Sequence, residues 1–330
     1  MKNLYDLSFD ELKDYLSSIG EPRYRASQIF CKNLQTASNV SPALKQKLRT
    51  DFYTEFPTIV KHQKSKDGTE KFLLQLGDGE LIETVLLTQD YGKTACISTQ
   101  VGCKMGCKFC SSGKHGFKRH LSAGEILTQI LMFDERPTNI VIMGMGEPLD
   151  NFDNVVKFLQ LVSHKEGIQI SGRNISLSTV GIPHGIRDFA DLKMQVNLCI
   201  SLHAPNDSIR KTIMPMAKVH PIREIMAATE YFFEKTHRRI IFEYALIDGV
   251  NCSPEHAREL ATLLKSLNAK SHVNLINLNA GGSGEYSPPP FATAKQFMDV
   301  LIKSGVSATM RKSKGSDIDA ACGQLASRKA

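Results

Sequence analysis

Apolar residues in the first 90 positions follow first a helical spacing and then a strand spacing. Ser8 and Glu11 have the spacing of a capping box ahead of Leu12 and Leu16, which predicts a helix. A second helix is expected over residues 24–33, after the break at Glu21-Pro22. The segment from about 57 to 90 predicts short strands at 71–76 and 81–87, joined by a turn at 77–79.

Beyond residue 90, short apolar strands alternate with amphipathic helices. This alternation is typical of an α/β fold with a mainly parallel sheet and helices outside it. We therefore expect an accessory domain at residues 1–90 and a strand–helix domain at residues 91–330. The strands are expected at 95–99, 139–143, 174–178, 196–202, 240–246 and 273–277, and the helices begin near 122, 152, 183, 222 and 254.

Unusual polar and glycine residues follow the ends of these strands. A cysteine-rich loop follows the first, a Gly-Met-Gly-Glu-Pro loop the second, Ser178 the third, Ser201-Leu202-His203 the fourth and Asn279 the sixth. In parallel α/β folds, active sites gather at the carboxyl ends of the strands. The sequence therefore predicts one site at this edge of the sheet.

Cys103, Cys107 and Cys110 have the spacing C-x3-C-x2-C. Three such thiolates can hold three irons of a [4Fe–4S] cluster and leave the fourth iron open, whereas ferredoxins normally close that position with a fourth cysteine. The alternative is zinc, with His115 or His120 as a fourth ligand, but no second ligand pair follows at finger-like spacing. Ligand count favours the cluster.

Composition is that of a globular protein, with 42% hydrophobic and 23% charged residues. No apolar run approaches the roughly 20 residues that a membrane helix needs, and the first residues lack a signal-peptide core. We therefore expect a cytoplasmic protein with no membrane association. In that compartment, eight cysteines indicate metal or thiol chemistry more than structural disulfides.

The net charge is +7, and the basic residues are clustered. One cluster spans 104–120, which contains no acid; a second spans 61–66, and a third consists of Arg311, Lys312 and Lys314. Surface charge alone would explain any one of them, but two flank cysteines that have candidate roles. Such residues position a nucleic acid through its phosphates, so we expect an RNA partner.

Three motifs together resemble the RlmN/Cfr family of radical S-adenosylmethionine (SAM) RNA adenosine methyltransferases. They are the three-cysteine motif with Phe109 before its last cysteine, residues 144–149, and residues 315–325, which contain Cys322. The likeness extends over nearly the whole chain. It implies a partial (β/α)6 radical SAM barrel, one [4Fe–4S] cluster, and SAM used twice in each turnover.

The resemblance also implies roles for individual residues. Cys322 would become S-methylcysteine and attack RNA, Cys96 would resolve the resulting adduct by forming a disulfide, and Glu83 stands where the family has an acid, a candidate proton acceptor. Cluster ligands would be Cys103, Cys107 and Cys110. The SAM contacts would be Gly146, Glu147, Ser178, Ser201, Leu202, His203 and Asn279.

The expected substrate is an adenosine of 23S rRNA at the peptidyl transferase centre, methylated at adenine C2, with transfer RNA beside the anticodon as a second target. A cellular electron donor and a thiol reductant would be needed, and we expect a monomer. Two alternatives stay open at this point. One is methylation at C8, as in Cfr, which confers antibiotic resistance; the other is a zinc-stabilised RNA-binding protein without catalysis.

Overall fold

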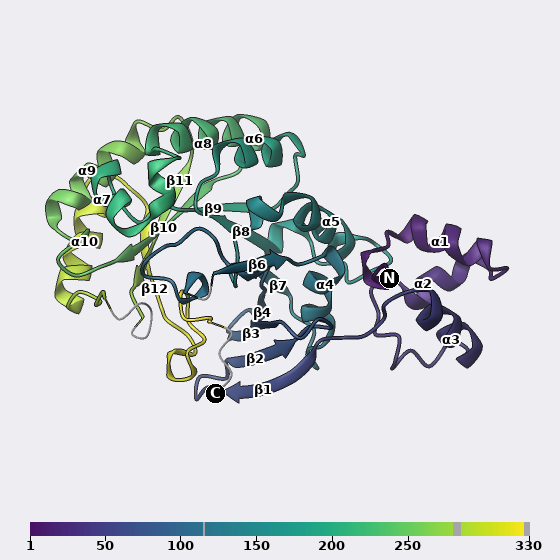
Figure 1. Cartoon of the computed structure of the whole chain (residues 1–330). Helices are drawn as coiled ribbons and strands as arrows, with labels where there is room; N and C mark the ends of the chain where they lie inside the picture. The colour runs from purple at the N-terminus through teal and green to yellow at the C-terminus, as the bar shows by residue number, and fades with distance from the viewer. Residues whose placement is uncertain (115, 280–284, 327–330) are drawn as a thin grey trace.

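The computed structural model describes residues 1–114, 116–279 and 285–326, and its centre is a row of parallel strands (Figure 1). All six predicted strands are present, the first of them three residues earlier than the expected 95–99, and a further strand, β12, ends the row. The strands are β4 (Gly92–Cys96), β7 (Asn139–Ile142), β8 (Ile175–Thr179), β9 (Asn197–Ser201), β10 (Ile240–Leu246), β11 (Ser271–Asn277) and β12 (Ala308–Arg311). The connecting helices are α4 (Ala123–Leu131), α5 (Phe152–Ser163), α6 (Pro183–Asp191), α7 (Asp207–Ile213), α8 (Ile222–Thr236), α9 (Pro254–Lys265) and α10 (Phe291–Lys303). The predicted α/β radical SAM fold is confirmed.

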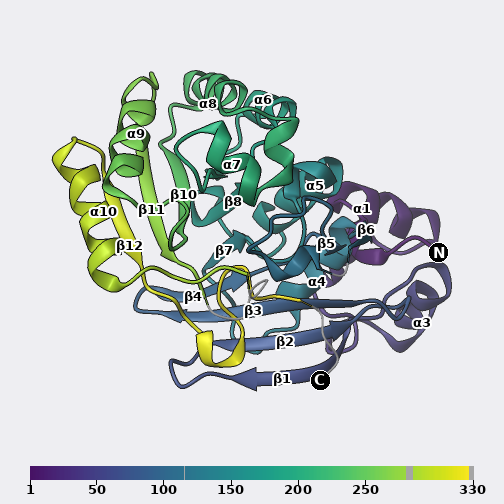
Figure 2. The ribbon, with the colours of Figure 1, turned by 60° about the vertical axis from the view of Figure 1, so that its left-hand side comes forward.

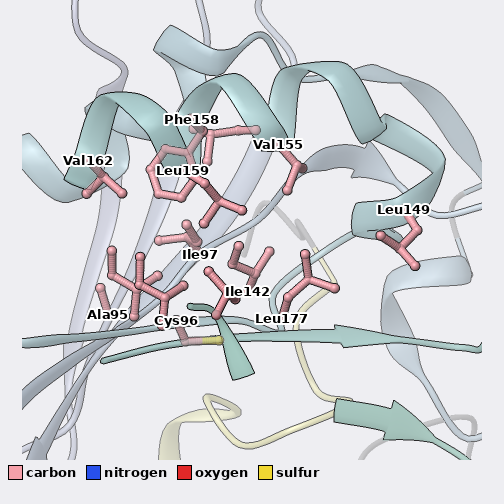
Figure 3. Close-up of a cluster of buried hydrophobic side chains, with 14 of the residues drawn as sticks. Ala95, Cys96, Ile97, Ile142, Leu149, Val155, Phe158, Leu159, Val162 and Leu177 are labelled. Carbon is pink, nitrogen blue, oxygen red and sulfur yellow. The ribbon is translucent and has the colours of Figure 1, made fainter. Parts of the chain in front are cut away.

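Helices cover the outer face of this sheet, and the packing decides which strand residues point inward. Figure 3 shows the apolar side of α5, with Val155, Phe158 and Leu159, packed over Ile97 and Ile142. Successive strand residues point to opposite faces. Cys96, between Ala95 and Ile97, therefore has its sulfur on the side away from α5 (Figure 3).

Three antiparallel strands extend the same sheet. They are β1 (Thr58–Lys64), β2 (Glu70–Gln75) and β3 (Leu81–Gln89). Because β3 pairs antiparallel with β4, all ten strands form one sheet in the order β1-β2-β3-β4-β7-β8-β9-β10-β11-β12. The domain boundary at residue 90 stays a prediction, although the sheet continues across it.

The N-terminal helices lie to one side of the sheet (Figure 1). α1 (Phe9–Ser18) begins with the predicted capping box of Ser8 and Glu11. The second helix is much shorter than predicted: a 3-10 turn, Arg23–Arg25, is followed by α2 (Ala26–Ile29). It ends there because Phe30 is not helical and Cys31 has a φ of 52°, in the left-handed region. α3 (Pro42–Asp51) completes the group.

The cysteine loop is held by a small hairpin that the sequence did not predict. β5 (Gln100–Gly102) pairs antiparallel with β6 (Phe117–His120). At its neck Gly102 has a φ of 73°, and a Cβ atom there would lie 1.8 Å from the Gly116 carbonyl oxygen. Only glycine can occupy position 102, because the two backbone segments approach each other too closely there for a side chain.

Candidate functional site

The carboxyl ends of the parallel strands surround one open cavity of about 1030 Å³. Except for Leu202, the predicted cluster ligands and SAM contacts all line it. They are Cys103, Cys107, Cys110, Gly146, Glu147, Ser178, Ser201, His203 and Asn279, and Cys322 also lines this cavity. The expectation that active-site residues follow the carboxyl ends of the parallel strands thus identified residues that line one cavity.

The three cysteines lie in a tight loop, in which the Cys110 amide donates to the Cys107 carbonyl at 3.1 Å. Burial raises the pKa of all three thiols, that of Cys103 to about 12, and repulsion from neighbouring cysteines of the loop adds to it for Cys103 and Cys107. Three thiolates would therefore need a strongly cationic group between them, which an iron–sulfur cluster provides.

Zinc fits this loop less well. Among the described residues, no three or more His, Cys, Asp or Glu side chains are placed to hold a single metal ion. His120 lies instead 3.1 Å from Gln100 Nε2, and His115 lies outside the described residues. A cluster distributes its protein ligands over separate irons, so it does not need the cysteines to converge on one ion.

The Gly-Met-Gly-Glu-Pro loop is packed tightly against the backbone after β4. A Cβ atom at Gly144 would lie 2.5 Å from the Ile97 carbonyl oxygen, and Gly146 has a φ of 106°. Glu147 is buried, and its carboxylate accepts hydrogen bonds from the amides of Leu149 at 3.1 Å and Val180 at 2.8 Å. Burial still raises the pKa of Glu147 to about 7, so an ammonium group would be well matched to this carboxylate.

Ser178 and Ser201 lie on neighbouring strands with their hydroxyl oxygens 3.2 Å apart. His203 is buried and strained at a φ of 55°, and its Nδ1 accepts from the Ala245 amide at 2.9 Å. Burial and the nearby Arg210 lower the pKa of His203 to about 3, so its ring is neutral. Leu202 is fully buried and does not line this cavity; its carbonyl accepts from Arg210 Nε at 3.1 Å.

Cys322 is exposed, although Ala321 and Gln324 on either side of it are buried, and the side-chain amide of Asn279 donates to the Cys322 carbonyl at 3.3 Å. Cys322 also lines a second cavity, which it shares with Cys96, Cys110 and Arg311. The two cysteines with proposed covalent roles therefore face a common space. They approach it from β4 and from a loop more than 200 residues later.

The two thiols differ in exposure: Cys322 is exposed, whereas Cys96 is buried. Cys96 is 9% exposed, and burial, together with negative charge on Cys322, raises the pKa of Cys96 to about 12. Arg311 opposes both effects. The pKa of Arg311 is itself raised, chiefly by the charge of Cys322 and then by that of Glu243.

Glu83, like Leu202, lines neither of these two cavities. Its buried carboxylate lies 3.4 Å from Lys71 Nζ and accepts from the Ala326 amide at 2.7 Å. It is thus close in space to the C-terminal segment that carries Cys322.

Two buried charges at the site were not predicted. Arg210 of α7 is fully buried and donates to the carbonyls of Leu202, His220 and Val180, which fixes the loops after β8 and β9. Glu243, within the apolar strand β10, lines the first cavity, and its Oε2 has no hydrogen-bond partner among the described residues. A charge inside an apolar strand was the available signal for Glu243.

Within the described residues, no helix is long and apolar enough to cross a bilayer. Comparison with known proteins agrees with the geometry of the site. Residues 97–264 match the radical SAM superfamily, and residues 2–53 match the ribosomal RNA large subunit methyltransferase N-terminal domain.

Curated relatives match over almost the full length. The chain is 44% identical to a protein of Clostridium novyi (strain NT), with 98% of each chain covered. It is 48% identical to one of Clostridium perfringens (strain 13 / Type A), over 98% of this chain and 96% of the relative. Both are described as probable dual-specificity RNA methyltransferase RlmN. A solved radical SAM methyltransferase from Sphaerobacter thermophilus is 38% identical, with a TM-score of 0.95 over 99% of this chain and 100% of that one. The chain therefore belongs to the RlmN family of radical SAM RNA methyltransferases, which use a [4Fe–4S] cluster and SAM.

Proposed function

We propose that this enzyme methylates adenine C2 of an adenosine in 23S rRNA at the peptidyl transferase centre, and also in transfer RNA beside the anticodon. The observation that carries the proposal is the placement of Cys322, which lines both the cavity of the three cysteines and the cavity of Cys96. A cysteine that receives a methyl group from SAM in the first cavity and is later released from RNA by Cys96 in the second must be accessible from both.

Cys103, Cys107 and Cys110 are the proposed ligands of the cluster, and SAM would occupy the cavity beside them. When bound, the reduced cluster and SAM supply a methyl group and a 5′-deoxyadenosyl radical. Glu147 would hold the amino group, with Gly146 allowing close backbone approach. Ser178, Ser201, His203 and Asn279 offer hydroxyl, imidazole and amide groups around the same space. The Leu202 backbone, held by Arg210, would set the position of the loop.

Cys322 would act as a methyl carrier because adenine C2 is not a nucleophile. Its thiolate would attack the methyl carbon of one SAM and release S-adenosylhomocysteine, and the radical supplied with a second SAM would remove a hydrogen atom from the S-methyl group. The carbon radical would then add to adenine C2, and the aromatic ring would be restored as a base takes the C2 proton and the oxidised cluster takes the unpaired electron. RNA is at that stage bound covalently to Cys322.

Cys96 would release the product. Its sulfur attacks Cys322 sulfur, the electron pair of the broken S–C bond goes to carbon and is protonated, and a Cys96–Cys322 disulfide remains for a thiol reductant to open. Negative charge on Cys322 raises the pKa of Cys96. That charge is gone once the sulfur carries carbon, so Cys96 becomes easier to ionise at the step that needs its thiolate.

The basic residues flanking the site fit an RNA substrate, and residues 1–90 are proposed as a further RNA contact. We expect the enzyme to act in the cytoplasm, which contains RNA substrates of this kind, an electron donor and a thiol reductant. We expect it to be a monomer. The role of Glu83 as proton acceptor stays a prediction.

Product analysis tests the proposal. The reconstituted enzyme, SAM, a reductant and a 23S rRNA fragment should yield 2-methyladenosine on nuclease digestion and mass spectrometry. A product that co-elutes with 8-methyladenosine would contradict the C2 assignment and favour the Cfr-type reaction. Protein with Cys107→Ala should lack the brown chromophore and give neither product.

A further inference from the structure

The C-terminal segment that carries Cys322 lies across the antiparallel strands β2 and β3, which are distant from it in the sequence (Figure 2). We propose that Lys71 and Glu83 form a buried clamp that holds this segment at both ends and so positions Cys322. The inference deepens the proposed function and rests on Cys322 being the methyl carrier.

The two clamp residues contact the segment on either side of Cys322. Lys71 Nζ donates to the Asp319 carbonyl at 3.2 Å, three residues before Cys322. Glu83 Oε2 accepts from the Ala326 amide at 2.7 Å, four residues after it. Cys322 therefore lies in a span whose ends bind the two partners of one ion pair.

The clamp is internal, unlike most ion pairs of this protein. The side chains of Lys71 and Glu83 are 8% and 7% exposed, with Nζ 3.4 Å from Glu83 Oε1. They come from neighbouring strands, since Leu73 pairs with Glu83 and Lys71 with Val85. Two charges buried at this depth are stable only with each other and with further hydrogen bonds, and here the segment supplies both of the further bonds.

Other contacts hold the start of the segment and extend the clamp to the site. Ser65 Oγ donates to Asp317 at 2.6 Å, and the Gly315 amide donates to Asp67 at 2.9 Å. At the other end, Ser112 Oγ, in the loop after the cluster cysteines, donates to the Leu325 carbonyl at 2.9 Å. The clamp thereby ties Cys322 to both the strand extension and the cysteine loop.

This geometry assigns Glu83 a positioning role, which is distinct from the role of proton acceptor. Its Oε1 faces Lys71, its Oε2 faces a backbone amide, and neither of the two site cavities reaches it. The two roles differ in timing. A clamp acts before RNA is present, while a proton acceptor acts only after the RNA adduct has formed.

Hydrogen exchange measured by mass spectrometry on the cluster-loaded full chain tests the clamp. In Lys71→Met and Glu83→Ala, the amides of residues 315–326 should exchange about tenfold faster, as expected for loss of a charged hydrogen bond. Peptides of the parallel strands should stay unchanged, which shows that the fold is intact. Glu70→Gln is the matched control, because Glu70 is the neighbour of Lys71 on β2 and binds His62 and Lys64, not the segment.

Glu83→Gln separates the two roles even if the other variants fold poorly. A glutamine oxygen still accepts from the Ala326 amide, so exchange of the segment should rise only partly, and turnover should be reduced but not abolished. Methylation of Cys322 without RNA should also be slowed in Lys71→Met and Glu83→Ala. The clamp proposal is refuted if the amides of residues 315–326 exchange at the wild-type rate in every variant. It is also refuted if Glu83→Gln methylates Cys322 at the normal rate but accumulates the RNA adduct, as expected of a proton acceptor. Exchange needs no turnover, so a wild type that never methylates Cys322 would refute the proposed function and leave the clamp result intact.

Discussion

Arg210 offers a quantitative test of how the site is held together. Its guanidinium is fully buried and donates to three carbonyls: Leu202 and His220, each at 3.1 Å, and Val180. In Arg210→Met the chain keeps an apolar stem of similar length, but all three acceptors lose their donor. Two of them belong to the loops that bring Ser201, His203 and Val180 to the proposed SAM cavity.

The expected loss follows from two opposing effects. Each charge-assisted hydrogen bond contributes about 1.5–3 kcal/mol, so three give about 4.5–9 kcal/mol. Against this, burial lowers the pKa of Arg210 to about 10, a desolvation cost of about 3 kcal/mol for the charged form. We therefore expect Arg210→Met to reduce the free energy of unfolding by about 1.5–6 kcal/mol.

Urea unfolding of anaerobically purified protein measures this change, and Lys211→Met is the matched control. Lys211 is the next residue of α7 and is exposed, so its variant should lie within about 0.5 kcal/mol of the wild type. Arg210→Lys keeps the charge but not the three-way fork, and should fall in between. If Arg210→Met is as stable as the control, the carbonyls have other partners and the reasoning is refuted.

Three further predictions concern the site. Cys96→Ala should still methylate Cys322 and attack RNA, but accumulate a protein–RNA crosslink on denaturing gels; prompt turnover would contradict the resolving role. Burial raises the pKa of Glu147 from 4.5 to about 7, so between these two pH values the folded protein keeps a proton that the unfolded chain releases. The free energy of unfolding is therefore highest below this range and falls as the pH rises through 7. Between about pH 5 and pH 8, the wild type should therefore lose up to about 3 kcal/mol of unfolding free energy relative to Glu147→Gln, and parallel pH profiles would refute the shift. In Gly144→Ala, the new Cβ 2.5 Å from the Ile97 oxygen should lower stability by about 1–3 kcal/mol, measured by the same unfolding; an unchanged midpoint would show that the loop can move.

Much of the fold could be predicted because its signals are local. Apolar periodicity located all six strands to within three residues, and the structure confirms both the capping box at Ser8 and the helix start expected near residue 122. The second helix was predicted too long because the left-handed conformation at Cys31 has no signal in a cysteine side chain. The hairpin of β5 and β6 was missed because its strands are only three and four residues long.

The site was predictable where residues follow strand ends and less so where contacts are distant. Glu147, Ser178, Ser201 and Asn279 share a cavity because parallel strands end at one edge. Neither the burial of Cys96 nor the contact of Glu83 with Ala326 follows from local pattern. The second depends on the C-terminal segment folding back over β2 and β3 (Figure 2), which brings together residues 243 positions apart.

The most direct test of the account is mass spectrometry of the Cys322 peptide from anaerobically purified, cluster-loaded protein supplied with SAM. We expect a gain of one methyl group on Cys322 and none on Cys96, which is buried. An unmodified Cys322 in protein with an intact cluster would contradict the methyl-carrier mechanism.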